Sequence, residues 1–70
     1  MKTIYTIWQG HRPVIKQTGS LHYVVSTNTM TQGATPHFFE RRAYAEIVSE
    51  YLMFINPMYD LSVEQSTIDL

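Results

Sequence analysis

The first part of the chain alternates between apolar and polar positions, as a β-strand with one buried face does. Residues 2–8 are rich in β-branched and aromatic side chains. Their alternation places Ile4 and Trp8 on one face and Tyr5 and Ile7 on the other. A strand is therefore predicted over residues 2–8.

Two further strands are predicted after turns. Gly10 can take the positive φ that a turn requires, and Pro13 can open a strand but not sit inside a central one, so the second strand is expected over residues 14–17. A second turn follows at residues 18–20, and alternation resumes over residues 21–27. The pattern predicts an antiparallel meander of three strands.

The second half of the chain shows helical periodicity instead. Thr35 suits the N-cap and Pro36 the first helical position, while Pro57 disfavours helical geometry in the residue before it. A helix is therefore predicted from residue 36 to about residue 55. Its apolar stripe follows the spacing i, i+3, i+4, i+7 and i+11, and consists of Tyr44, Ile47, Val48, Tyr51 and Ile55. The opposite face carries Arg42, Glu46, Ser49 and Glu50.

These elements predict an α+β fold in which a three-stranded antiparallel sheet packs on one long helix, with a domain over residues 1–57. Residues 58–70 form a tail with three alternatives. Ser62 to Gln65 could open a short helix as a capping box, or the segment could be an edge strand or a mobile end. Because one helix covers only one face of a sheet, the other face is expected to be solvated or used for binding.

The composition favours an interaction surface. Charged residues make up only 16% of the chain, against a usual figure of about 25%, while five Tyr, four Met and one Trp are present. Tyr, Trp and Met are enriched at protein interfaces and Lys and Glu are depleted there. The absence of cysteine excludes disulfides and thiolate metal sites. No membrane span is expected, because the longest apolar run covers only residues 51–55. No secretory signal is expected either, and a cytoplasmic protein is predicted.

Charge is distributed unevenly. Residues 1–39 carry Lys2, Arg12 and Lys16 and no acid, a net of +3. The remainder carries two arginines against six acids, a net of −4, which gives the overall −1. The basic half could meet nucleic-acid phosphates, the two halves could pair head to tail in a homo-oligomer, or they could face each other within one fold. Dedicated nucleic-acid binders make about six to ten phosphate contacts and have a pI above about 9, so the pI of 6.2 argues against that class.

Catalytic and metal chemistry find little support in the sequence. His11, His22 and His37 lack any metal-ligand spacing. Glu46 and Glu50 lie one helical turn apart and could serve acid–base chemistry, bind a cation or make acidic contacts with a partner, although a solvent-facing helix surface accounts for them equally well. No nucleophile or phosphate loop accompanies them. The sequence therefore predicts no enzyme and no cofactor.

The candidate partner-binding residues lie in the predicted sheet. Tyr5, Trp8 and Tyr23 are sheet aromatics, and Arg12 and Lys16 supply positive charge beside them. Because Tyr5 and Trp8 face opposite sides of one strand, the helix cannot cover both. One of these rings is expected to be exposed as a hot spot for a protein partner.

The last six residues, QSTIDL, carry a separate motif. They resemble the C-terminal peptides with which bacterial DNA polymerases and related factors dock on the sliding clamp. The resemblance implies that Gln65, Ile68 and Leu70 are anchors. This sequence has Ile where Leu is usual, and Asp before its last residue.

Together these features predict a non-enzymatic protein-interaction module. Its small size and its lack of catalytic and metal-binding motifs are typical of phage or plasmid accessory factors and of anti-defence inhibitors, which bind a larger host complex. The alternative is a nucleic-acid-binding domain that uses a weakly basic sheet face. A third possibility is a homodimer formed through exposed strand edges or through the opposite charges of the two halves.

Overall fold

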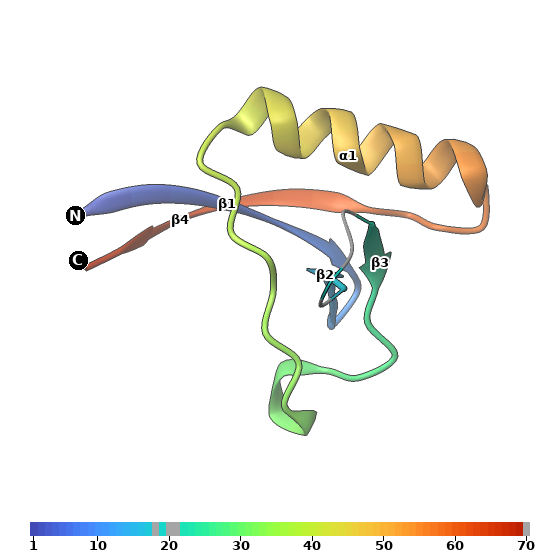
Figure 1. Ribbon diagram of the computed structural model, residues 1–70, viewed down its shortest axis with the longest axis horizontal. Coiled ribbons are helices and arrows are strands. Elements are labelled where there is room, and N and C mark those ends of the chain that lie inside the picture. The colour runs from blue at the N-terminus through green and yellow to red at the C-terminus, as the bar shows by residue number, and fades with distance from the viewer. Residues whose placement is uncertain (18, 20–21, 70) are drawn as a thin grey trace.

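The computed structural model describes residues 1–17, 19 and 22–69. A four-stranded antiparallel sheet, ordered β3-β2-β1-β4, packs against one helix (Figure 1). The elements are β1 (Lys2–Gln9), β2 (Arg12–Lys16), β3 (Tyr23–Val25), the 3₁₀ turn η1 (Met30–Gln32), α1 (Arg42–Ile55) and β4 (Ser62–Ile68). The predicted α+β class is confirmed, and the predicted count of three strands is wrong.

The fourth strand is the segment whose conformation the sequence left open. β4 pairs with β1 over its whole length, from Lys2 opposite Ile68 to Trp8 opposite Ser62. Val63 lies opposite Ile7 and packs against the buried core. Residues 62–68 are therefore an edge strand rather than a helix, because pairing with β1 satisfies their backbone and places Val63 on the core.

The β2–β3 hairpin differs from its prediction mainly in its ends. β2 begins at Arg12, because Arg12 pairs with Gln9 across a turn in which Gly10 has a φ of 60°. β3 spans only three residues, against the seven predicted. Residues 18, 20 and 21, which include parts of the predicted turn and strand, lie outside the described residues.

A short segment before the helix is inserted between β1 and β2. The backbones of Tyr5 and Phe39 exchange two hydrogen bonds of 2.8 and 2.9 Å, and the His37 N–H donates to the Val14 carbonyl at 3.0 Å. Phe39 is buried in the core. The predicted helix start at Pro36 is wrong for this reason. A helix beginning there would lose these bonds and the burial of Phe39, so α1 begins only at Arg42.

The helix also presents a different face to the sheet from the one its apolar stripe predicted. α1 packs on β1 and β4, and its buried residues are Ala45, Val48, Ser49 and Leu52. This face lies roughly a quarter turn from the predicted stripe. Ser49, which was expected on the polar face, is buried, and all members of the stripe except Val48 are exposed. The small side chains of Ala45 and Ser49 let the helix approach the sheet closely.

The opposite face of the sheet is neither open nor fully solvated. Ile4, Thr6 and Pro13 are buried on it. The Trp8 indole lies over Thr6, and its Nε1–H donates to Thr6 Oγ1 at 2.8 Å. The loop that carries η1 lies on this side of the sheet, away from α1 (Figure 1). The Trp8 ring and the η1 loop thus cover part of this face, whereas Ser62, Glu64 and Ser66 of β4 are exposed on it.

The helix orientation predicts that two truncations in α1 lower the stability by very different amounts. Leu52→Ala removes a side chain that is 3% exposed and should lower the free energy of unfolding by about 2–5 kcal/mol. Ile47→Ala, at a position that is 62% exposed, should change it by less than about 1 kcal/mol. Urea titrations followed by circular dichroism measure both values. A larger loss for Ile47→Ala than for Leu52→Ala would mean that the predicted stripe does face the sheet.

Candidate protein-interaction surface

An aromatic cluster joins β3 to the start of α1. The Tyr23 ring lies 5.2 Å from His37, 5.3 Å from Phe39 and 6.4 Å from Tyr44, measured between ring centroids. Phe39 in turn lies 4.7 Å from His37 and 5.6 Å from Tyr44. Such edge and tilted contacts stabilise the cluster beyond the area that it buries. The cluster therefore holds β3 and the N-terminal turn of α1 in a fixed relation.

Two groups in this cluster have shifted pKa values. The hydrogen bond with Tyr44 and partial burial raise the pKa of Tyr23. Burial, and then the positive charge of Lys16, lower the pKa of His37, so the neutral imidazole is favoured in the folded protein. The Lys16 ammonium itself lies 6.0 Å from the centre of the Tyr23 ring.

An apolar groove runs between the outward flank of α1 and β3. It has a volume of about 470 Å³. Large apolar side chains of α1 form one wall, and residues of β3 and of the connection between β2 and β3 form the other. The lining residues are Gln17, His22, Tyr23, Val24, Tyr44, Ile47, Val48, Tyr51, Leu52 and Ile55. Phe54, which is also exposed, lies one turn from Tyr51 and extends the apolar surface of the helix. We call Tyr44, Ile47, Tyr51, Phe54 and Ile55 the apolar flank.

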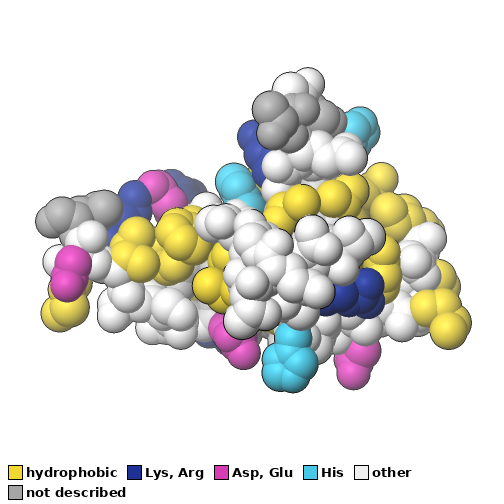
Figure 2. Space-filling view, turned by 90° about the horizontal axis from the view of Figure 1, so that it is seen from below, with side chains coloured by type: hydrophobic (Ala, Val, Ile, Leu, Met, Phe, Trp, Pro, Cys, Tyr) yellow, Lys and Arg dark blue, Asp and Glu magenta, His cyan; other side chains and the backbone are white. Residues whose placement is uncertain are grey.

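One acidic side chain of α1 borders the apolar flank, because Glu50 lies one helical turn from both Ile47 and Phe54. Viewed from the side of the sheet opposite α1, hydrophobic side chains are most extensive toward the right but also occur at the left, and acidic side chains lie along the lower edge and around the left end (Figure 2). On α1 itself, Arg42 pairs with Glu46 at 3.1 Å on the polar side, and the Arg42 guanidinium carbon lies 5.9 Å from the centre of the Tyr5 ring. Within the described residues, no acidic side chain lines the groove.

The predicted binding residues do not form one surface. Strand alternation places Tyr5, Arg12, Lys16 and Tyr23 on the helix side of the sheet and Trp8 on the other side. All three aromatic rings are half-buried, whereas Arg12 and Lys16 are exposed. Only Tyr23 lines the apolar groove. These residues are thus divided between the two faces of the sheet, as the opposite orientations of Tyr5 and Trp8 along β1 require.

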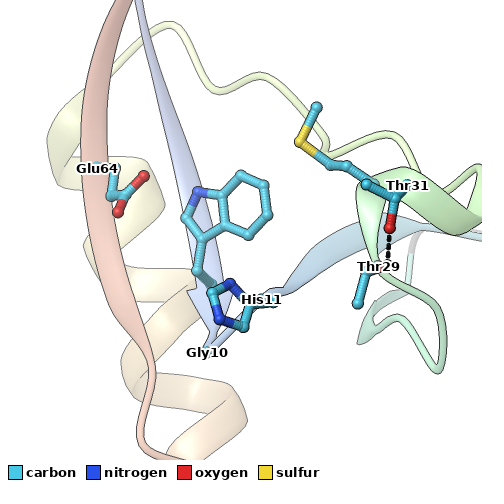
Figure 3. Close-up of a pocket in the computed structure, with 7 residues that line it drawn as sticks. Gly10, His11, Thr29, Thr31 and Glu64 are labelled. Atoms are coloured by element: carbon cyan, nitrogen blue, oxygen red, sulfur yellow. Dashed lines mark hydrogen bonds between the residues drawn. The ribbon is translucent and has the colours of Figure 1, made fainter.

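Trp8 belongs to a second hollow, of about 520 Å³, on the opposite face. Glu64 of β4 forms one side and the η1 segment, with Thr29 and Thr31, forms the other, while His11 stands at the β1–β2 turn (Figure 3). The hydroxyls of Thr29 and Thr31 are 2.8 Å apart. Trp8 and Met30 give this hollow apolar surface, and His11, Glu64 and the two threonines give it polar and charged groups.

The remaining predicted contact residues lie on other surfaces. Glu46 and Glu50 are exposed on α1, and they are not among the residues that line either hollow. Gln65 is exposed and Ile68 is half-buried, and both belong to β4, where they face Tyr5 and Lys2 of β1. Leu70 lies outside the described residues. The proposed clamp-like anchors are therefore part of an edge strand as far as Ile68.

The sequence pattern placed four of the five residues of the apolar flank on the buried face of the helix, whereas the structure exposes them. The sequence does carry a signal for it, because Ala45, Val48, Ser49 and Leu52 form a second stripe at i, i+3, i+4 and i+7. Two stripes on one helix give an apolar arc wider than one sheet can cover. The exposed stripe is the one with the larger side chains.

No protein family model, curated protein or solved structure matches this chain. Among the described residues, no group of three or more potential metal ligands is close enough to hold an ion. The described part of the chain also has no helix of the length and apolar character needed to cross a membrane.

The lowered pKa of His37 predicts a pH-dependent stability. Below the ordinary value of 6.5 the unfolded chain binds a proton more readily than the folded protein, so stability should fall as the pH drops from about 7 to about 5. The hydrogen bond from Lys2 is the main cause that lowers the pKa of Glu40. Protonation of Glu40 should therefore reduce the stability further only near and below pH 4.5. Urea unfolding across this range measures the slope. His37→Gln should flatten it, and an unchanged slope would assign the dependence to other groups.

Proposed function

We propose that this protein is a non-enzymatic interaction module that binds a protein partner through the apolar flank of α1 and the adjoining groove. The observation that carries the proposal is the exposure of five large apolar side chains along one side of a helix whose other side is already packed. A small module of this kind acts by occupying a surface of a larger protein, as inhibitors and accessory factors do.

The size of the exposed surface supports binding. Tyr44, Tyr51 and Phe54 are 50%, 60% and 83% exposed. Since a buried aromatic side chain covers about 150–250 Å², these three rings leave roughly 300–500 Å² in water before Ile47 and Ile55 are added. The largest apolar patch on a typical monomer is about 300–600 Å² and is often functional. Tyr and Phe are also among the residues enriched at interface centres.

The nucleic-acid alternative has weaker support in the geometry. Lys2 forms an ion pair with Glu40, which leaves less free charge on the basic half. Arg12 and Lys16 are the exposed basic side chains of the β2 strand. The apolar flank has no feature that would favour a phosphate backbone over a protein surface.

A pull-down from lysate of the source cells tests the proposal. Wild-type protein should retain one stoichiometric protein partner after nuclease treatment, and Ile47→Glu and Tyr51→Glu should each reduce its recovery at least roughly tenfold, because they place a charge in the centre of the interface. Circular dichroism confirms that these variants remain folded, which their exposure predicts. Mass spectrometry measures recovery.

Gln65→Glu provides the matched control, because it adds the same charge at an exposed position of β4. It should leave recovery unchanged. Recovery lost only with Gln65→Glu would move the site to the C-terminal motif, and recovery lost with nuclease would favour the nucleic-acid alternative. Either result would contradict the proposal.

A further inference from the structure

The groove beside α1 runs along a strand edge rather than over the face of the sheet. His22, Tyr23 and Val24 are consecutive residues and all three line it. Side chains of consecutive strand residues point to opposite faces, so the feature that these three share is the edge of β3 itself. β3 is an outermost strand in the order β3-β2-β1-β4.

The hydrogen-bond register identifies the backbone groups on that edge. The Ser26 N–H donates to the Pro13 carbonyl at 2.9 Å, and the Gln17 N–H donates to the His22 carbonyl at 3.1 Å. Residues 22, 24 and 26 therefore direct their backbone groups toward β2. In an antiparallel pair the alternate residues point the other way, so Tyr23 and Val25 direct their N–H and C=O groups outward.

We propose that the groove binds an extended segment of the partner protein, which adds to β3 as a fifth strand and inserts apolar side chains against the apolar flank of α1. This inference rests on the proposed function and specifies how the partner is held. The outward backbone groups of Tyr23 and Val25 bond to the segment. Alternate side chains of the segment then contact Ile47 and Tyr51. In strand addition the backbone hydrogen bonds supply affinity and the side-chain contacts supply specificity.

The charge around the groove specifies the segment further. Within the described residues no acidic side chain lines the groove, and the sequence has no acid before Glu40. The Lys16 ammonium lies 6.0 Å from the centre of the Tyr23 ring, at the edge of the groove. A segment that alternates apolar and acidic residues is therefore complementary to this site.

The same charge argues against a second copy of this chain as the occupant. A two-fold dimer is isologous, so each β3 edge would meet an identical β3 edge. The Lys16 charges of the two copies would then lie at the same interface, and within the described residues no acid lines the groove to compensate them. An acidic segment from a different protein avoids this repulsion.

A display library of random linear peptides is the probe. Peptides are selected on the wild-type protein and counter-selected on Tyr51→Glu. The expected peptides share apolar residues at alternate positions together with acidic residues. On binding, hydrogen exchange followed by NMR should slow for the Tyr23 and Val25 amides of the wild-type protein, since both become bonded to the peptide.

Substitution of Val25 tests the edge directly. Val25→Pro removes one outward N–H at a position where an edge strand tolerates proline, and it should weaken peptide binding at least roughly tenfold. Val25→Thr keeps that N–H and a similar shape, and it should bind within about twofold of wild type. Fluorescence polarisation measures both affinities.

Several results would overturn strand addition. These are selected peptides whose binding leaves the Tyr23 and Val25 amides unprotected, peptides that bind as helices, or no peptide enriched over Tyr51→Glu. A wild-type dimer that Val25→Pro converts to a monomer in sedimentation would assign the edge to a second copy. In the pull-down, a partner lost with Ile47→Glu but kept with Val25→Pro would overturn only this inference, whereas a partner kept with both would overturn the proposed function as well.

Discussion

The arrangement of this protein depends on the hydrogen bonding of β1 along both of its edges. One edge pairs with β4 from Lys2 to Trp8, and the other pairs with β2 only at Trp8 and Gln9. Further along that second edge, Phe39 takes the place of β2 and exchanges two backbone bonds with Tyr5. Because Phe39 is held against β1, the helix that follows it starts close to β1 and runs over β1 and β4. The space beside β3 is left to side chains and to the groove.

The position of α1 explains why a helix with two apolar stripes shows one of them to solvent. The stripe with Ala45 and Ser49 packs on the sheet, since small side chains let the helix and strand backbones approach closely and pack tightly. The stripe with Ile47 and Tyr51 is too bulky for the same closeness and turns toward β3. The aromatic contacts of Tyr23 with Phe39 and Tyr44 then fix the distance between β3 and the helix. The groove is a consequence of this packing, and its walls are held by the core.

The uneven charge of the sequence is partly resolved inside the fold. Lys2 of the basic half pairs with Glu40 of the acidic half, so one of the three interpretations of the charge asymmetry describes an observed contact. Lys16 instead lies beside the groove, where its charge helps to lower the pKa of His37. Within the described residues, none of the acids of α1 and β4 lines the groove, although Glu50 borders the apolar flank. An apolar groove with a basic edge therefore remains, and this combination underlies the proposal of an acidic, extended protein segment as its ligand.

The sequence by itself determined the elements whose signals are local. Alternation identified β1 and the places of β2 and β3, and helical spacing together with Pro57 identified α1 and its end at Ile55. Three features were decided only by tertiary contacts between distant residues. Pairing with β1 made residues 62–68 a strand, the bonds of Phe39 with Tyr5 delayed the helix to Arg42, and close packing on the sheet selected the smaller of two apolar stripes. Periodicity shows which residues share a face, but it cannot show which face the rest of the protein will cover, because that depends on partners far away in the chain.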